Sequence, residues 1–332
     1  MRAQMRREGP NEWQFWLIAL LVGIAAGYAA VLFRFGISTL QTLIYGADDL
    51  RLHTQLTGLH PIWIILIPIL GGLAVGWILH RFTDDGKARS VANVIEAAAL
   101  REGRVPLKTG LASAGASLIT LSTGGSTGRE GPVVHLAATL SSWVSDKISA
   151  SPMTARELLG CAVAAAVSAS FNAPIAGAVF ALEVVLRHYA LHAFAPIVVA
   201  SIAGTVVSRV HMGDVTEFTL PEHSLGFYQE LPAFLILGVI SGLVAVAMMK
   251  AIFLAEAAGD RVQAGLKMPG WVRPGLAGAM LGCIAVYFPH IIGVGYETTS
   301  RALTGGLGFW EAVIFAGVKC LAVALTFAGR MG

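Results

Sequence analysis

A glycine-rich turn with one carboxylate is the most chemically informative part of this sequence. The segment Ser122–Pro132 reads Ser-Thr-Gly-Gly-Ser-Thr-Gly-Arg-Glu-Gly-Pro and lies between two apolar stretches. Pro132 and the apolar residues after it predict the start of a helix, with proline in the first turn. A helix start offers unbonded N–H groups and about half a positive charge, and glycines before it let a ligand approach the backbone. The turn therefore predicts an anion-binding site that also holds the carboxylate of Glu130.

Glu130 gives this turn a group that gains and loses a proton. An ionised carboxylate inside a membrane is costly, so its presence there predicts a functional role. At a helix start the carboxylate is stabilised, and it acts as a tethered anion that competes with a mobile one. Once protonated, it would leave the site and admit the mobile ion. The alternative interpretation is that Glu130 only caps the helix and pairs with Arg129 at the membrane surface.

The composition predicts that the turn lies in a membrane. Charged residues make up 13% of the 332 residues and the mean hydropathy is +0.70, whereas a soluble domain has about 25% charged residues. The stretches 61–79, 158–182 and 231–249 contain no Asp, Glu, Lys or Arg, and each reaches the roughly 17–25 residues that a spanning helix needs. The apolar runs are continuous, which argues against a β-barrel. We therefore predict an all-α, polytopic integral membrane protein with no nucleic-acid-binding patch.

Apolar segments separated by Gly, Pro and Ser predict helices that are broken within the membrane. Such irregular backbone is tolerated where it lines a cavity, and transporters use it to place helix ends around an ion. The excess of Lys and Arg before residue 13 and in 81–90 predicts a cytoplasmic N-terminus in a plasma (inner) membrane. The predicted spans are 13–36, 61–81, 106–122, 131–147, 154–171, 174–187, 192–211, 230–257, 271–288 and 308–328, with short helices at 91–101 and 298–305.

Two motifs resemble those of the CLC family of chloride channels and chloride/proton antiporters. Gly128–Pro132, Gly-Arg-Glu-Gly-Pro, is similar to the Gly-Lys/Arg-Glu-Gly-Pro motif of that family. Residues 171–177, Phe-Asn-Ala-Pro-Ile-Ala-Gly, resemble its Phe-Asn-Ala-Pro-Leu-Ala-Gly turn between two helices. The two motifs occur in the family's order and spacing, and the helix pattern agrees from about residue 13 to the C-terminus.

The resemblance implies a CLC-type inverted-repeat fold of broken and tilted helices, assembled as a homodimer in the lipid bilayer. It implies a cytoplasmic segment at 1–12, a first transmembrane repeat with the gating motif at 13–212, and the start of a second repeat at 213–332. The transported ligand would be chloride or a related small anion, with no cofactor and no metal. Glu130 matches the family's gating glutamate. The anion-binding residues implied are Gly128, Arg129, Glu130, Gly131 and Pro132, together with Arg89 and Ser90.

Arg89 marks a departure from the family pattern. The family's Gly-Ser-Gly-Ile-Pro motif corresponds here to Ala-Arg-Ser-Val-Ala at 88–92, so Arg89 stands where the family has its anion-coordinating serine. A fixed positive charge there would bind an anion tightly or disturb conduction. The alternative is that Arg89 faces the cytoplasm and takes no part in the pathway.

Val184 marks a second departure. Proton-coupled members of the family carry a Glu-Glu pair after the Asn-Ala-Pro helix, and the corresponding residues here are Glu183 and Val184. Valine at the proton-relaying position favours a channel-like protein. Glu183 itself is interpreted as a helix-end charge that faces water or pairs with Arg187.

The second repeat is predicted to be incomplete. The family's Gly-x-Phe-x-Pro motif and its later anion-contacting tyrosine should follow residues 329–332, where the sequence given ends. We therefore expect a C-terminally truncated sequence that contains about half of the anion-coordinating residues. A weak internal similarity between the helices before residues 125 and 332 agrees with a repeat.

The function predicted from the sequence is transport of chloride or a similar anion through a pore gated by Glu130, channel-like rather than proton-coupled. The alternatives are a CLC-type anion/proton antiporter, a non-conducting paralogue, or a broken-helix carrier of another solute. An enzyme is not predicted, because no catalytic Ser/His or Asp pair and no His-Glu-x-x-His stretch is present.

The histidines and cysteines have simpler interpretations. His135, one turn after Glu130, titrates near neutral pH when exposed, but packing is the favoured role. His188 and His192 are spaced by four residues, yet two ligands do not make a metal site. The three cysteines lie in apolar runs and are predicted to be buried thiols.

Overall fold

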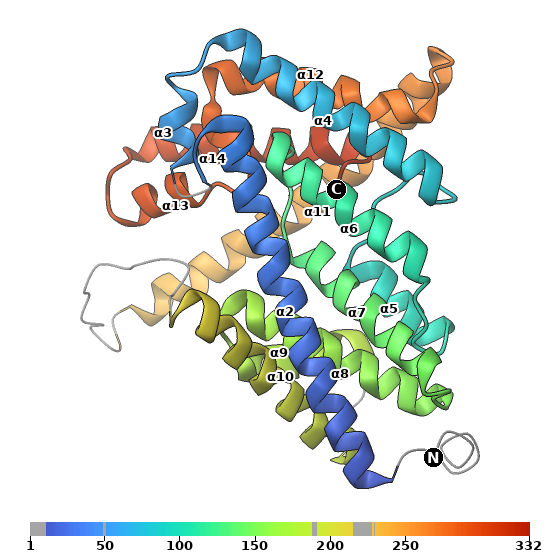
Figure 1. The fold of residues 1–332 in the computed structure, drawn as a ribbon. Helices are drawn as coiled ribbons and strands as arrows, with labels where there is room; N and C mark the ends of the chain where they lie inside the picture. Colours follow the sequence, from blue (N-terminus) through green and yellow to red (C-terminus); the bar gives the residue numbers. More distant parts are fainter. Residues whose placement is uncertain (1–10, 49–50, 188–190, 215–227, 229) are drawn as a thin grey trace. The chain divides into compact units, whose positions relative to one another are not determined.

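The computed structural model describes residues 11–48, 51–187, 191–214, 228 and 230–332 (Figure 1), and these residues form helices without any β-strand. One helix has a π-helical end, and two 3₁₀ turns, Gly270–Val272 and Pro289–Ile291, connect later helices. The elements are α2 (Glu12–Tyr45), α3 (Leu52–Leu56), α4 (Pro61–Phe82), α5 (Val91–Leu100), α6 (Leu107–Thr123), α7 (Glu130–Lys147), α8 (Pro152–Phe171), α9 (Pro174–Phe180) with its π-helical continuation Ala181–Leu186, α10 (Leu191–Met212), α11 (Leu231–Gly265), α12 (Arg273–Tyr287), α13 (Tyr296–Leu303) and α14 (Phe309–Ala328).

The helices confirm the predicted all-α, polytopic fold. Among the described residues, five helices are long and apolar enough to cross a membrane: α2, α4, α10, α11 and α14. The shorter α5, α7 and α9 confirm that the helix pattern is interrupted after residue 90. Trp13, Trp63 and Trp77 are exposed near helix ends, as expected of residues at a membrane interface.

The predicted end of the first helix, residue 36, is wrong. α2 continues to Tyr45, and within its last turns Gln41 and Tyr45 are buried and hydrogen-bonded. Gln41 Nε2 donates to the carbonyl of Leu121 at 3.4 Å, and the Tyr45 hydroxyl donates to the carbonyl of Thr123 at 2.9 Å. These two bonds satisfy carbonyl groups at the end of α6, which lack partners within their own helix. The hydrogen bonds of Gln41 and Tyr45 therefore accompany the continuation of α2 beyond the predicted end.

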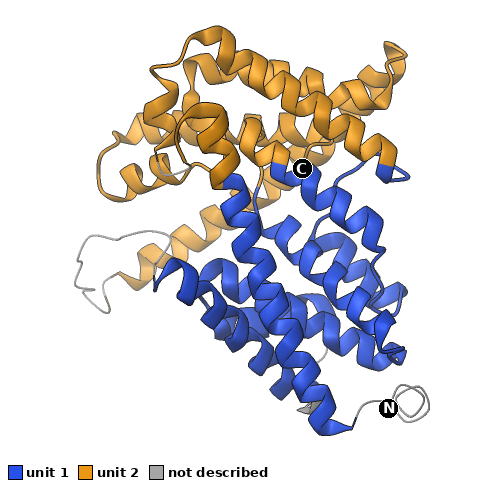
Figure 2. Ribbon diagram, viewed as in Figure 1, with its two compact units in different colours: residues 1–37, 82–118, 128–217 blue, residues 38–81, 119–127, 218–332 orange. Residues whose placement is uncertain are grey.

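The chain divides into two compact units (Figure 2). One contains residues 1–37, 82–118 and 128–217, and the other contains 38–81, 119–127 and 218–332. The unit around α7 and α8 holds the predicted gating motif, from Gly128 onward. The division into two sequence repeats at residue 212 remains a prediction, since compactness does not report repeat boundaries.

α8 forms the core of the first unit. The Ser151 hydroxyl accepts the backbone N–H of Thr154 at 3.2 Å, which caps the helix start beside Pro152. From Leu158 to Val167 every residue of the helix is buried, four of the ten being alanine and one glycine, and α7, α9 and α10 pack around it. The small side chains bring backbones together as predicted.

A substitution at Gly204 on α10 tests the close packing of α10 against α8. A Cβ atom at Gly204 would lie 2.4 Å from the carbonyl oxygen of Ala165 on α8, whereas one at Gly115 on α6 would meet nothing within 4 Å. Gly204→Ala is therefore expected to destabilise the protein by about 1–3 kcal/mol through overpacking. Gly115→Ala should be neutral or slightly stabilising, because alanine favours helix. Thermal unfolding of both variants in detergent checks this, and equal midpoints would contradict it.

In the second unit, α4 packs against α12, and α14 packs against α11 and α12. Tyr45, Leu56, Ile64, Leu281 and Ile291 belong to one buried apolar cluster there. Arg273 is also buried, and its guanidinium donates to the carbonyls of Ala328 at 2.6 Å and Glu256 at 3.0 Å. Arg273 of α12 thus links the last turn of α14 to the C-terminal part of α11.

The cysteine prediction holds for one residue of three. Cys161 is fully buried in α8, whereas Cys283 on α12 and Cys320 on α14 are exposed. The prediction of buried thiols is wrong for these two, because apolar helices of this length expose apolar residues where a membrane replaces the protein interior. His188 lies outside the described residues, as does the side chain of His192.

Candidate anion site at the start of helix α7

The turn between α6 and α7 requires glycine for its backbone. Gly124 adopts a φ of +125°, a conformation that other residues rarely adopt, directly after the last residue of α6. The N–H of Gly125 donates to the carbonyl of Thr120 at 2.8 Å, and the N–H of Ser126 donates to the Thr326 hydroxyl at 3.0 Å. These bonds hold the irregular segment that leads into Gly128.

The first turn of α7 leaves two backbone donors without helical partners. Glu130 is the first helical residue, and the N–H of Val133 donates to the carbonyl of Arg129 at 3.2 Å. Pro132 has no N–H to offer. The groups that point out of the helix start are therefore the N–H groups of Glu130 and Gly131, at the positive end of the helix dipole. This is the local geometry predicted for an anion site.

Glu130 lies at this helix end with its side chain 30% exposed. Its Oε1 is 3.8 Å from the Nε of Arg129, and its Oε2 is 2.8 Å from where a Cβ on Gly128 would stand. The carboxylate therefore turns back along the chain over Gly128. Arg129 is 7% exposed and not on the protein surface. The Arg129–Glu130 pair of the alternative interpretation is therefore present, with its arginine buried in the protein.

Ser90 reaches the start of α7 from a second helix. It is the N-terminal capping residue of α5, and its N–H donates to Asn93 Oδ1 at 3.0 Å. A Cβ on Gly131 would lie 3.7 Å from the Ser90 Cβ. The starts of α5 and α7 therefore converge, and both present the positive end of a helix dipole. Of the residues implied by the family resemblance, the structure brings together Ser90, Gly128, Glu130 and Gly131.

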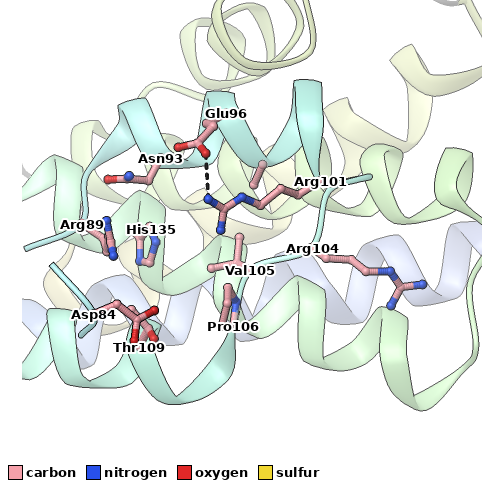
Figure 3. Close-up of a pocket in the computed structure, with 11 residues that line it drawn as sticks. Asp84, Arg89, Asn93, Glu96, Arg101, Arg104, Val105, Pro106, Thr109 and His135 are labelled. Carbon is pink, nitrogen blue, oxygen red and sulfur yellow. Dashed lines mark hydrogen bonds and ion pairs between the residues drawn. The ribbon is translucent and has the colours of Figure 1, made fainter. Parts of the chain in front are cut away.

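The Arg89 side chain extends into a different space from Ser90. Its guanidinium makes two contacts with the carboxylate of Asp85, at 2.9 and 3.1 Å, and its backbone N–H donates to the Ser113 hydroxyl at 2.6 Å. The Arg89 side chain, 21% exposed, lines a cavity together with His135 (Figure 3). Sequence reasoning missed the Asp85 contact, because both residues lie in the non-helical connection between α4 and α5, where spacing does not predict which side chains pair.

The Asn-Ala-Pro turn lies between α8 and α9. Asn172 has a φ of +54° and ends α8; its amide donates to Asp214 and accepts from Arg209, both at 2.7 Å. Pro174 then starts α9. The motif was predicted to form a turn between two helices, and the structure confirms that it does.

Val184 lies in the π-helical turn Ala181–Leu186 and is 37% exposed. Glu183 beside it is exposed, and the ion pairs of the described residues do not include one between Glu183 and Arg187. The interpretation of Glu183 as a water-facing helix-end charge agrees with this exposure. The backbone thus departs from a regular α-helix around Val184, as is frequent at functional sites.

Within the described ranges, no group of three or more His, Cys, Asp or Glu side chains lies close enough to hold an ion. His135 is buried, with 3% of its surface exposed, which agrees with the predicted packing role.

Comparison with known proteins places these features in context. Residues 71–331 match the family model described as voltage gated chloride channel. The chain is 29% identical over 334 residues to chloride channel protein CLC-f of Arabidopsis thaliana, covering 95% of this chain and 42% of the relative. It is 28% identical over 321 residues to the voltage-gated ClC-type chloride channel ClcB of Escherichia coli, covering 95% and 75%. The chain thus spans less than half the length of CLC-f.

Solved structures show the same fold at low identity. A slow cyanobacterial Cl⁻/H⁺ antiporter aligns with a TM-score of 0.79 at 19% identity, covering 96% of this chain and 74% of that one. A CLC-type fluoride/proton antiporter aligns with a TM-score of 0.76 at 21% identity, covering 95% and 75%. The predicted CLC-type fold is therefore confirmed.

Proposed function

Because the chain belongs to the voltage-gated chloride channel (CLC) family, we propose that it forms the gated part of an anion pathway for chloride or a related small anion. The observation that carries the proposal is the start of α7. There the carboxylate of Glu130 stands at the same helix end as the unbonded N–H groups of Glu130 and Gly131. One negative charge fits such a helix end well. A mobile anion and the ionised Glu130 side chain therefore compete for it.

Protonation of Glu130 is the gating step in this proposal. The neutral acid no longer benefits from the helix dipole, so it leaves the helix end and a mobile anion takes its place. Gly128 permits this movement, because the Glu130 carboxylate packs over its Cα without meeting a side chain. Arg129, buried beside the site, keeps the local potential positive in both states. The anion-binding residues proposed are Gly128, Arg129, Gly131, Pro132 and Ser90.

The chain is an integral membrane protein, as its family and its five long apolar helices indicate. We propose in addition that it works as a homodimer, with a cytoplasmic N-terminus, in a plasma or inner membrane. Transport rather than enzymatic chemistry is the function that this arrangement supports.

Channel-like conduction is favoured over proton exchange by Val184, which has no ionisable group at the relaying position. The antiporter alternative is supported by the names of two structural neighbours, which are a Cl⁻/H⁺ and an F⁻/H⁺ antiporter. A non-conducting paralogue is supported by Arg89 in place of the family's serine.

Ion flux from liposomes that contain the purified full-length protein tests the proposal. Chloride, nitrate or fluoride efflux is expected to exceed that of empty liposomes, with no movement of sodium. In the same liposomes a chloride gradient should drive no proton uptake against a proton gradient, since Val184 cannot carry a proton. Flux of sodium or an organic anion without an inorganic anion would refute the proposed function. Uphill proton movement would leave anion transport standing and refute the channel-like assignment.

A further inference from the structure

An apolar groove runs between α2 and α10 in the first unit, and all its lining residues come from these two helices. Its volume is about 540 Å³. The lining residues are Leu20, Ile24, Tyr28, Val199, Ile202, Ala203, Val206, Val207, Val210 and His211. Only Tyr28 and His211 among them are polar, and their rings meet edge to face with the centroids 5.2 Å apart. The groove therefore has one long apolar part and one polar end.

Small residues on both helices form the bottom of the groove. A Cβ at Gly23 of α2 would lie 2.7 Å from the Ala200 Cα of α10, and one at Gly27 would lie 3.0 Å from the Gly204 Cα. Because residue numbers rise together in these two contacts, the helices run parallel with their backbones touching. Ala203, 7% exposed, lies beside this contact. Larger, exposed side chains of α10 stand next to it: Ile202, Val206 and Val210.

The length of the groove corresponds to one leaflet of a bilayer. Both helices are among those long and apolar enough to cross a membrane. The α10 residues that line the groove extend from Val199 to His211, roughly 18 Å along the helix axis, and half of the hydrocarbon core of a bilayer is about 15 Å thick. His211 stands one residue before the end of α10. The polar end therefore lies where a spanning helix reaches the headgroup region, and the apolar part extends toward the middle of the membrane.

The hydrogen-bonding groups at the polar end fit a hydroxyl group. His211 Nδ1 lies 2.9 Å from the carbonyl oxygen of Val207, which can only accept, so Nδ1 carries the proton. In the neutral ring Nε2 then has a lone pair and accepts a hydrogen bond. The hydroxyl group of Tyr28, a residue 44% exposed, both donates and accepts. A ligand hydroxyl can donate to Nε2 and accept from Tyr28, whereas a carboxylate has no proton to give to Nε2.

The arginine near the polar end already has partners. Arg209, two residues before His211, donates from Nε to Asn172 Oδ1 at 2.7 Å, and another of its nitrogens lies 3.3 Å from Asp214 Oδ1. Its charge is therefore matched by a carboxylate. An anionic headgroup would gain little from Arg209 and would lose hydration beside an apolar groove, which is costly. The charges thus favour an uncharged headgroup.

We propose that this groove binds one neutral, single-chain lipid whose hydroxyl headgroup lies between Tyr28 and His211. At about 30 Å³ for each water-sized group, a volume of about 540 Å³ holds about 18 groups, which suits one long hydrocarbon chain and not two. The chain lies over Ala203, where the two helix backbones meet. This site is separate from the proposed anion pathway, and neither proposal depends on the other.

Photolabelling of the full-length protein in liposomes tests the proposal, with a hexadecanol that carries a diazirine and an alkyne on its chain as the probe. Labels are expected in residues 20–28 and 199–211, saturating at one per protein chain. Unlabelled hexadecanol should compete at least tenfold better than its methyl ether, hexadecanoic acid or a diacylglycerol. Equal competition by the ether or the acid would refute the hydroxyl assignment, and equal competition by the diacylglycerol would refute the single chain. Unsaturable labelling of all exposed helices would identify ordinary bilayer lipid and overturn the proposal.

Variants with matched controls separate the groove from its polar end. Val206→Trp fills the groove from a half-exposed position, so labelling is expected to fall at least tenfold. Val239→Trp makes the same change at an exposed valine of α11 and should label as the unaltered protein does. His211→Phe keeps a ring but removes Nε2, so hexadecanol and its methyl ether should then compete within about twofold of each other.

Three results with these variants would overturn the proposal. The first is normal labelling of folded Val206→Trp, and the second is a preference for the alcohol that persists in His211→Phe. The third is labelling that falls as more protein is placed in each liposome, because the groove would then belong to an interface with a second copy of the chain.

Discussion

Anion flux through Glu130→Gln is expected to be independent of pH and as fast as the fastest flux of the unaltered protein. Glutamine resembles the protonated acid in size and charge, so it does not compete with a mobile anion for the start of α7. In the unaltered protein, flux should rise as pH falls, because protonation removes the competing charge. Between pH 7.5 and pH 4.5 we expect a change of tenfold or more that the variant lacks. Chloride efflux from liposomes at these two pH values measures it.

Glu183→Gln is the matched control for this result. Glu183 is an exposed glutamate of the same unit, at the end of a helix that does not hold the gate. Its substitution should leave the pH dependence intact. If Glu130→Gln kept the full pH dependence, gating by this carboxylate would be refuted, whichever anion was transported.

Flux through Gly131→Leu is expected to fall at least tenfold, whereas Gly131→Ala should stay within about threefold of the unaltered protein. A Cβ at this position makes ordinary contact with the Ser90 Cβ at 3.7 Å, so alanine fits. The larger side chain of leucine has to enter the space where the starts of α5 and α7 converge. That space is where a mobile anion would reach the N–H groups of Glu130 and Gly131.

Gly115→Leu provides the steric control, because a Cβ at Gly115 meets nothing within 4 Å. It adds the same side chain to a helix of the same unit and should not change flux. Bromide located by anomalous scattering would separate the causes further. Loss of the peak at α7 in Gly131→Leu indicates that the site is filled. Normal flux in Gly131→Leu would mean that the anion does not pass between Ser90 and Gly131.

The sequence was sufficient for features that depend on local chemistry. Helix boundaries agreed within a few residues where an apolar run met Pro or Gly, as at Pro174 and at the start of α7. The turn before α7 and the helix start after it were predicted because glycine-rich backbone and proline lie within one short segment. Such signals need no knowledge of what packs against them.

Features that depend on distant partners were missed. α2 continues past residue 36, and Gln41 and Tyr45 there meet carbonyls some 80 residues later in the chain. The cavity beside His135 likewise combines residues of α5, α6 and α7. A role for Asn93 could not be predicted from the sequence, because its side chain accepts the N–H of Ser90 and lines a cavity that several helices form together. No local pattern records which side chains tertiary packing places together.

The contact between α8 and α10 has a mechanical consequence for gating. At Gly204 these helices meet with peptide groups nearly touching, and α2 meets α10 in the same way where Gly23 faces Ala200. Where long side chains separate two helices, small rotamer changes let the helices shift. At Gly204 and Gly23 backbone atoms face backbone atoms, so no side chain can adjust in that way. This three-helix bundle therefore behaves as a stiff frame, and opening it by helix displacement would require separating backbones that are in direct contact. In the proposed gating, the moving part is therefore the side chain of Glu130, whose rotation requires no displacement of these helices.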